Sequence, residues 1–179
     1  MPNERLIRIS KLMSLILRHE PEQFAVVLDP EGYTTIDDIV RAMRESVPDA
    51  CVDDVHRVVR LIEPDKARFS INGPDIRANY GHSLSQRIVQ QQGVPPGILL
   101  HGTSENALPM IRREGIHPMR RQYVHLTTNR DIAGRVGGRH GKVSILEIDA
   151  LRASEAGVAF YRANESFWLT DYVAPEFIL

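Results

Sequence analysis

Six short stretches of the sequence place an arginine or a histidine beside glycine or a hydroxyl-bearing or aromatic residue. An arginine guanidinium can bind a phosphate through two parallel hydrogen bonds, and glycine lets the backbone approach a ligand closely. An imidazole titrates near neutral pH and can move a proton at such a site. The stretches are Leu17-Arg18-His19, Arg68-Phe69, Ile76–Ser83, His101-Gly102-Thr103, Arg121–Leu126 and Gly138–Gly141. Together they predict a site that handles a phosphate-bearing ligand such as a nucleotide.

Each stretch taken alone also has an ordinary structural interpretation. Arg18 and His19 at the end of a helix would interact favourably with the helix dipole. Arg68 on a strand would be an exposed arginine at the edge of a sheet. The histidines of the later stretches would cap a helix or pack in a sheet with hydrogen bonds to the backbone. The glycines around residue 139 would form a tight turn.

Charge is distributed unevenly along the chain although the net charge is only −1. Residues 20–65 carry twelve acidic and four basic residues, a net charge of −8, and residues 110–142 carry eight basic and two acidic residues, a net charge of +6. The basic segment predicts a footprint for phosphate groups, or equally a charged surface that balances an acidic lobe.

Several classes of protein are disfavoured by what the sequence lacks. No apolar run approaches the roughly 20 residues that span a bilayer, and the first residues do not form the apolar stretch of a signal peptide, so we expect a cytoplasmic protein. The single cysteine, Cys51, excludes an internal disulfide and a cysteine-based zinc site. The sequence contains no P-loop or GxGxxG motif and no evident metal-ligand set, which argues against NTP hydrolysis and Rossmann-type binding.

The first half of the chain is predicted to be helical with one hairpin. Pro21 should end the first helix, and Thr35 and Asp53 should cap the second and third. Asn72-Gly73 predicts the turn of the hairpin. The expected elements are helices over 5–18, 36–45 and from 53 onward, a turn over 31–33, and strands over 68–71 and 75–80. Three helices followed by a hairpin form a winged-helix pattern.

The second half is predicted to be rich in strands. The segment 93–97, Gly-Val-Pro-Pro-Gly, predicts a boundary. One helix over 104–114 should end at Gly115. The expected strands cover 98–102, 123–127, 143–148, 158–162 and 166–170. We therefore predict an α+β chain with two lobes, residues 1–92 and 98–179.

The order of these stretches resembles the RNA (tRNA) 2′-phosphotransferase family of KptA-like proteins. The resemblance runs over nearly the whole chain and extends to Ser10–His19 and Phe167–Thr170. It implies a winged-helix-like RNA-binding lobe over 1–92 and an ADP-ribosyltransferase-like NAD-binding lobe over 98–179. It also implies a monomer that acts on RNA without a metal.

The reaction that the resemblance implies has two steps and consumes NAD⁺. An internal RNA 2′-phosphate attacks the anomeric carbon of the nicotinamide ribose and expels nicotinamide. The ribose 2″-hydroxyl then attacks that phosphate, which releases RNA with a 2′-hydroxyl and ADP-ribose 1″,2″-cyclic phosphate.

The resemblance also implies roles for individual residues. It makes Arg18, His19, Arg68 and Arg121 catalytic, with Arg139 as the alternative to Arg121. Because these residues come from both lobes, we expect the chemistry in a cleft between the lobes. The expected cofactor-binding residues are Gly81, His82, Ser83, His101, Gly102, Thr103, His125 and Arg139, and the expected substrate-binding residues are Arg77 and His140.

The sequence departs from the family pattern at two places. Tyr80 stands where the family usually has glutamine, and Glu165-Ser166 stands where it usually has Asn-Gly. Glu165 lies roughly where other ADP-ribosyltransferases keep a catalytic glutamate. Two alternatives therefore remain: an ADP-ribosyltransferase that modifies nucleic-acid ends or proteins and stops after the first step, and a non-catalytic winged-helix module that binds RNA.

Overall fold

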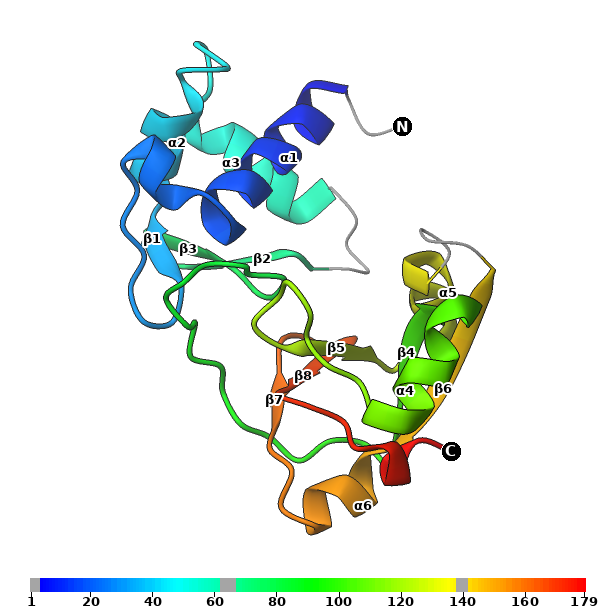
Figure 1. The fold of residues 1–179 in the computed structure, drawn as a ribbon. Coiled ribbons are helices and arrows are strands. Elements are labelled where there is room, and N and C mark those ends of the chain that lie inside the picture. Colours follow the sequence, from blue (N-terminus) through cyan, green and yellow to red (C-terminus); the bar gives the residue numbers. More distant parts are fainter. Residues whose placement is uncertain (1–3, 62–66, 138–141) are drawn as a thin grey trace. The chain divides into compact units, whose positions relative to one another are not determined.

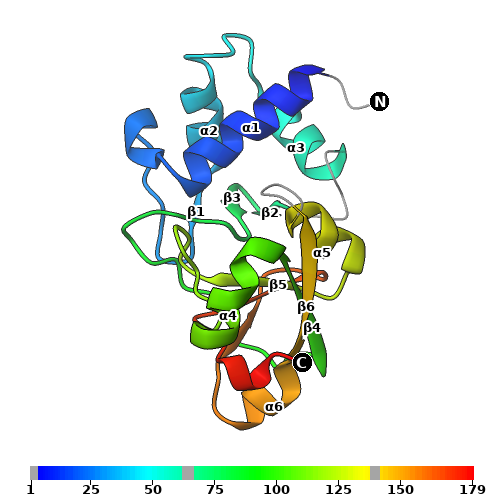
Figure 2. The same cartoon turned by 45° about the vertical axis from the view of Figure 1, so that its right-hand side comes forward.

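The computed structural model of the chain describes residues 4–61, 67–137 and 142–179. The chain divides into two compact units, Met1–Val89 and Gln90–Leu179. Each unit combines helices with an antiparallel sheet (Figures 1 and 2). The expected α+β class is therefore confirmed.

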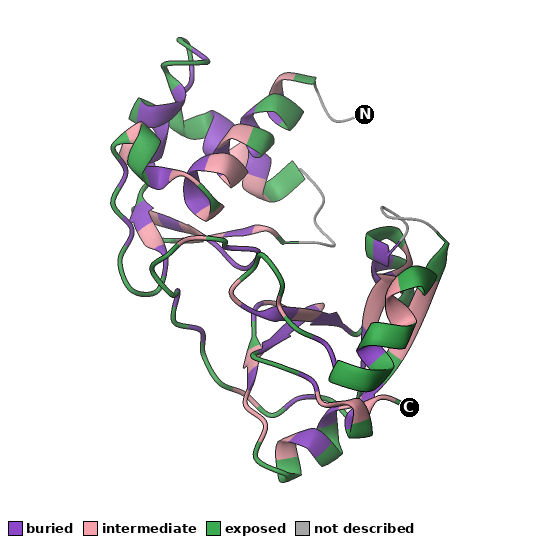
Figure 3. Ribbon diagram, in the orientation of Figure 1, coloured by how far each residue is buried: buried purple, intermediate pink, exposed green. Residues whose placement is uncertain are grey.

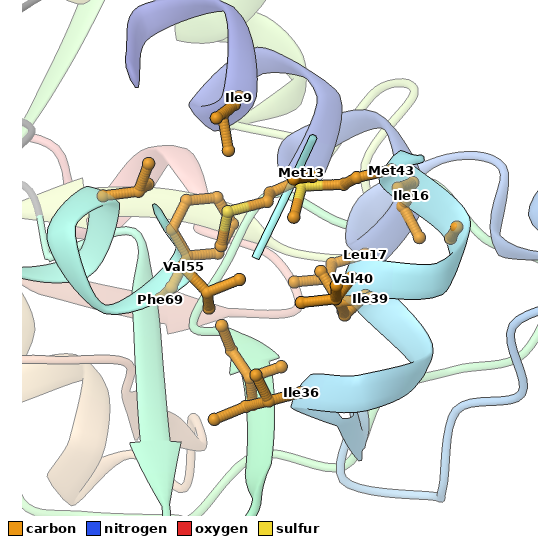
Figure 4. Close-up of a cluster of buried hydrophobic side chains, with 14 of the residues drawn as sticks. Ile9, Met13, Ile16, Leu17, Ile36, Ile39, Val40, Met43, Val55 and Phe69 are labelled. Carbon is orange, nitrogen blue, oxygen red and sulfur yellow. The ribbon is translucent and has the colours of Figure 1, made fainter. Parts of the chain in front are cut away.

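In the first unit, three helices lie on one side of a small sheet with the strand order β1-β3-β2 (Figures 1 and 2). The elements are α1 (Glu4–Arg18), the 3₁₀ turn η1 (Pro21–Phe24), β1 (Tyr33–Thr35), α2 (Ile36–Met43), α3 (Val52–Leu61), β2 (Phe69–Asn72) and β3 (Asp75–Ala78). Buried apolar side chains from all three helices and the sheet form one cluster, to which α1 contributes Ile9, Met13 and Ile16 (Figure 4).

The first two helices form where the sequence predicts them, although α2 ends at Met43 rather than residue 45, and the third begins differently. Thr35 caps α2 by accepting a hydrogen bond from the Asp38 N–H at 3.1 Å. The prediction that Asp53 caps the third helix is wrong, because α3 already begins at Val52. The Asp54 carboxylate instead reaches back to accept from the Cys51 N–H at 3.2 Å, the acidic half of a capping box.

The hairpin of the first unit forms, but its turn and return strand differ from the prediction. Asn72 is still paired with Asp75, so the connecting residues are Gly73 and Pro74, and Gly73 has a φ of 58°. The return strand ends at Ala78 rather than residue 80. The predicted turn over 31–33 is one residue too long, because Tyr33 already pairs with Arg77 as the start of β1.

The second unit contains a five-stranded antiparallel sheet with the order β6-β4-β5-β8-β7. Its elements are β4 (Ile98–Ser104), the 3₁₀ turn η3 (Glu105–Ala107), α4 (Leu108–Glu114), β5 (Val124–Thr127), α5 (Arg130–Gly137), β6 (Val143–Asp149), α6 (Ala150–Glu155), β7 (Phe160–Arg162), β8 (Phe167–Thr170) and the 3₁₀ turn η5 (Pro175–Phe177). All five strands were expected, and Gly115 ends α4 with a φ of 80° as expected.

The prediction of a single helix in this half is wrong, because α5 and α6 are also present. Helix α5 contains Gly134 and Gly137, and glycine lowers helix propensity by about 1 kcal/mol relative to alanine. Helix α6 has only 6 residues and begins where the Asp149 side chain accepts from the Arg152 N–H. Local sequence patterns therefore do not predict either helix.

Each unit has its own buried apolar cluster (Figure 3). The cluster of the second unit includes Leu99, Phe160 and Trp168. Within the described ranges, the longest helix is α1, and none of the helices has the length and apolar character needed to cross a membrane.

Candidate functional site

Arg18 is the last residue of α1, and its position is fixed by the segment that follows β3. The Ser83 N–H donates to the Arg18 carbonyl at 2.9 Å and so satisfies a carbonyl at the helix end. The Arg18 guanidinium makes a long hydrogen bond, 3.4 Å, to the Arg68 carbonyl. It also lies over the rings of Phe69 and Tyr80.

His19 follows directly and is exposed. Its Nδ1 lies 2.8 Å from Ser83 Oγ, so a serine hydroxyl orients the ring. Ser83 thus holds the backbone of Arg18 and the side chain of His19 at the same time. A cavity of about 360 Å³ lies beside this pair and is lined by residues 19–23, 26–28 and 83–86.

Arg68 lies directly before β2, and Asn79 fixes its backbone. The Asn79 N–H donates to the Arg68 carbonyl at 2.9 Å, and Asn79 Nδ2 donates to the Ala67 carbonyl at 2.7 Å. Ala67 has a φ of 34°, an unfavourable region for a residue with a side chain, and Asn79 is almost fully buried. Sequence reasoning missed this role of Asn79, and its place between Arg77 and Gly81 was the available signal.

Arg77 and His82 lie in the same part of the first unit. The Arg77 guanidinium lies over the Tyr33 ring, 4.9 Å from its centroid, and Nη1 is 3.5 Å from the Glu31 carbonyl. His82 is 2% exposed, and its Nε2 has no hydrogen-bond partner among the described residues. Burial, with the nearby charges of Arg18, Arg77 and His19, lowers the pKa of His82 to about 4. His82 is therefore neutral at physiological pH and adds no charge to the cluster.

The buried His82 predicts an acid-dependent loss of stability. Its folded pKa of about 4 lies below the ordinary value of about 6.5, so the unfolded chain binds the proton more tightly. The stability that His82 contributes is therefore complete above about pH 6.5 and falls as the pH is lowered toward 4. We expect a loss of about 2 kcal/mol at pH 5 and about 3 kcal/mol at pH 4.

Native-state hydrogen exchange of core amides in α1 and α2 measures this loss in the first unit. In the His82→Gln variant, which cannot titrate, this part of the pH dependence should disappear. His56→Gln serves as the matched control, because His56 is a half-exposed histidine on α3. An identical pH slope in wild type and His82→Gln would contradict the assignment.

These residues give the first unit a cluster of cationic side chains suited to phosphate. Arginine guanidinium groups bind phosphate oxygens bidentately and stabilise developing negative charge without a metal. In the described part of the chain, no group of three or more histidine, cysteine, aspartate or glutamate side chains could hold a metal ion.

In the second unit, His101 on β4 is held by its neighbour strand. Its Nδ1–H donates to the His125 carbonyl on β5 at 3.0 Å, so the neutral ring presents Nε2 as an acceptor. Burial lowers the pKa of His101, although the hydrogen bond to His125 opposes the shift. This agrees with the interpretation of a histidine satisfied by the backbone, and it leaves one ring nitrogen able to accept from a hydroxyl.

Gly102 and Thr103 lie where α5 rests directly on β4. A Cβ added at Gly102 would lie 1.8 Å from the Ala133 carbonyl oxygen, and one added at Gly137 would lie 2.7 Å from the Thr103 carbonyl oxygen. The absence of side chains at these positions thus allows the helix and the strand to touch. A pocket of about 200 Å³ adjoins this contact and is lined by His101, Gly102, Arg121 and His125, among others.

Arg121 is exposed and lies in the loop before β5, where its N–H donates to the Pro118 carbonyl at 3.1 Å. Part of the basic segment around it is paired at the surface, since Arg113, Arg130 and Lys142 form salt bridges with Glu114, Glu147 and Glu105. The expected site residues Arg139 and His140 lie outside the described residues.

The comparisons with known proteins match nearly the whole length of the chain rather than one motif. The family model of the RNA 2′-phosphotransferase, Tpt1/KptA family matches residues 4–172, which include all the expected site residues named above. The chain belongs to this family. A relative from Herpetosiphon aurantiacus is 36% identical over 99% of this chain and 98% of its own length.

Other family members are similarly related. A relative from Thermococcus kodakarensis is 37% identical over 96% of this chain and 94% of its own length. One from Pectobacterium atrosepticum is 39% identical over 95% of both chains. All three are named "Probable RNA 2′-phosphotransferase".

The expected site residues that the structure describes are distributed between the two units. The first unit holds Arg18, His19, Arg68, Arg77, Gly81, His82 and Ser83, and the second holds His101, Gly102, Thr103, Arg121 and His125. Within each unit, hydrogen bonds link residues that lie far apart in the sequence, such as His19 with Ser83 and His101 with His125.

Proposed function

We propose that this chain is an NAD⁺-dependent RNA 2′-phosphotransferase that removes an internal 2′-phosphate from RNA. The observation that carries the proposal is the cluster at the end of α1, where Ser83 holds both Arg18 and His19 and the Arg68 carbonyl accepts from Arg18. Membership of the RNA 2′-phosphotransferase family supports the same activity.

The first unit binds the RNA and its 2′-phosphate in this proposal. Its three helices packed on a three-stranded sheet support a winged-helix-like lobe. Arg18 and Arg68 bind the phosphate oxygens and stabilise the charge that moves onto them during transfer. His19, oriented by the Ser83 hydroxyl, holds the phosphate or carries a proton in the second step.

The second unit is proposed to bind NAD⁺ as an ADP-ribosyltransferase-like lobe. The fit rests on His101, whose Nδ1–H is committed to the His125 carbonyl, so that Nε2 can accept from a ribose hydroxyl. The adjoining pocket has an apolar wall that includes Leu100, Val124 and Phe167, which suits an aromatic ring of the ligand. Arg121 is proposed, on the family resemblance, as the fourth catalytic residue.

The proposed reaction conserves the phosphate through two displacements. The RNA 2′-phosphate oxygen forms a bond to the anomeric carbon of the nicotinamide ribose as the bond to nicotinamide breaks. The 2″-hydroxyl of that ribose then loses its proton and bonds to the phosphorus, while the RNA 2′-oxygen leaves and takes up a proton. The products are 2′-hydroxyl RNA, nicotinamide and ADP-ribose 1″,2″-cyclic phosphate.

A single assay tests the proposed function. The protein is incubated with NAD⁺ and an RNA oligonucleotide that carries one internal 2′-phosphate, and the masses of RNA and nucleotide products are followed. We expect dephosphorylated RNA together with the cyclic ADP-ribose phosphate. Intact NAD⁺ and unchanged RNA would rule out the activity and leave an RNA-binding module.

His19→Ala should separate the two steps if the imidazole moves a proton only in the second. RNA that carries ADP-ribose on its 2′-phosphate should then accumulate, because the arginines still support the first displacement. Ser83→Ala, which removes the hydroxyl beside Nδ1, should give the same product pattern with a smaller effect. A proportional loss of both steps in His19→Ala would assign the histidine to phosphate binding instead.

A second candidate function is ADP-ribosyl transfer to another acceptor. Glu165 favours it, because this exposed carboxylate lies roughly where other ADP-ribosyltransferases keep a catalytic glutamate. The turn that contains Glu165 is fixed by the Asn164 side chain, which accepts from the Ser166 and Phe167 N–H groups. Phe167 lines the pocket of the second unit. A stable ADP-ribosylated product that Glu165→Gln abolishes would support this candidate.

A further inference from the structure

The guanidinium of Arg18 lies against two buried aromatic rings. Its central carbon is 5.6 Å from the centroid of the Phe69 ring and 5.1 Å from that of the Tyr80 ring. Phe69 is 6% exposed and Tyr80 is 7% exposed. A cation held over an aromatic face gains more from the contact when the pair is shielded from water.

The backbone beside Tyr80 is shaped to admit this contact. Gly81 has a φ of 91°, and a Cβ at this position would come within 3.4 Å of the Arg18 guanidinium nitrogen Nη1. The Ser83 N–H fixes the Arg18 carbonyl two residues further on. The segment from Tyr80 to Ser83 therefore holds Arg18 by its side chain and by its backbone.

Ring contacts suit an arginine that must bind phosphate. They engage the flat face of the guanidinium and use none of its N–H donors, which point outward in the plane of the group. A hydrogen-bonding or acidic neighbour would compete for those donors. Two rings thus restrict the orientation of the Arg18 guanidinium without occupying its N–H donors, one of which makes the long bond to the Arg68 carbonyl.

Tyr80 is buried but does not belong to the main apolar cluster of the first unit. Among the described residues, the buried apolar cluster of the first unit includes Phe69 and Ala78 but not Tyr80. Tyr80 also stands where the RNA 2′-phosphotransferase family, as the resemblance implies, usually has glutamine. A glutamine side chain at this position would offer no ring to the Arg18 guanidinium.

We propose that Tyr80 is a positioning residue that, together with Phe69, holds the Arg18 guanidinium in the orientation that binds the transferred phosphate. The proposal rests on the phosphotransferase function proposed above. Tyr80 acts through Arg18 and does not itself touch the reacting atoms.

The kinetic test compares two replacements of Tyr80. Tyr80→Phe keeps the ring and should retain at least half of the wild-type kcat for the 2′-phosphorylated RNA. Tyr80→Leu keeps apolar bulk without a ring and should lower kcat about 3- to 30-fold with little change in KM for NAD⁺. Phe177→Leu is the matched control, because it removes a comparable ring contact, Arg152 at 5.2 Å, in the second unit.

Two further measurements separate positioning from a general loss of structure. In protein labelled with ¹⁵N-arginine, the ring currents should shift the Arg18 Hε resonance in wild type and Tyr80→Phe, and the shift should shrink in Tyr80→Leu. In an Arg18→Ala background, adding Tyr80→Leu should lower the residual rate less than twofold, because the residue it acts through is absent.

An unchanged Hε resonance in Tyr80→Leu, or the same fold-loss with and without Arg18, overturns the proposal while the phosphotransferase function stands. A wild-type protein that transfers no 2′-phosphate overturns the function and with it the kinetic role of Tyr80. In that case the Hε shift, which needs no activity, still decides whether Tyr80 holds Arg18.

Discussion

Replacing Arg68 by alanine should lower the rate of 2′-phosphate transfer by about 10²- to 10³-fold and leave the fold intact. The reason is that a preorganised cation stabilises the negative charge that develops next to it in the transition state. Removal of one such donor raises the activation free energy by about 3–4 kcal/mol. Arg68 is only half-buried, and the backbone contacts that place it belong to Ala67 and Asn79. These backbone contacts do not involve the guanidinium, so Arg68→Ala should retain them.

Single-turnover rates with the 2′-phosphorylated oligonucleotide, together with thermal unfolding, measure this effect. Arg41→Ala is the matched control, because it also removes one positive charge from the first unit. Arg41 is an exposed residue of α2 that pairs with Asp38 at 2.7 Å. Its loss should change the rate less than twofold. If Arg68→Ala kept near-wild-type activity, Arg68 would not belong to the catalytic group.

A variant of Asn79, which fixes the backbone beside Arg68, should produce a smaller effect in the same experiment. Asn79 donates to the Ala67 carbonyl from its side chain and to the Arg68 carbonyl from its backbone, and only the first bond depends on the side chain. Asn79→Ala therefore removes one of the two bonds, and we expect a smaller loss of rate than in Arg68→Ala. The two variants differ in mechanism, because the first displaces a cation and the second removes it.

The contrast between Ser83 and Asn79 shows what sequence alone reveals about such a site. Ser83 carries a hydroxyl in a Gly-His-Ser stretch, so its type and its neighbours alone indicate a candidate site residue. Asn79 looks like an ordinary loop residue, and its importance comes from tertiary contacts with residues about 12 positions away. Local sequence patterns show which residues have suitable side-chain chemistry, but they do not predict such long-range contacts with the backbone.

Secondary structure was predictable where one face of an element is regularly apolar. The helical spacing of Ile9, Met13 and Ile16 predicted α1, and Pro21 predicted its end near Arg18. Helix α5 was missed because its residues follow a packing requirement instead, with Gly137 where the helix touches β4. The glycine of the His101-Gly102-Thr103 stretch was interpreted as a place for a ligand to approach, whereas its open side is occupied by the Ala133 carbonyl.

Gly102→Ala should therefore destabilise the second unit strongly, by about 3 kcal/mol or more, because the added methyl group would overlap backbone rather than a movable side chain. The Cβ would lie 1.8 Å from the Ala133 oxygen and 2.6 Å from the Ala133 carbonyl carbon. Relief requires α5 to shift away from β4, and that shift would also disturb the pocket beside His101. NAD⁺ binding should weaken together with stability.

Trp168, the single tryptophan of the chain, is a buried residue of β8 in the second unit, so its fluorescence reports the unfolding of that unit in urea.

Two glycine replacements serve as controls. Gly97→Ala has nothing within 4 Å of the new Cβ and should be close to neutral. Gly134→Ala meets only the Ile145 side chain at 3.8 Å and should stabilise α5 by up to about 1 kcal/mol, since alanine favours the helix. If Gly102→Ala unfolded at the same urea concentration as Gly97→Ala, the close contact between α5 and β4 would be refuted, because no backbone at that distance can accept a methyl group without moving.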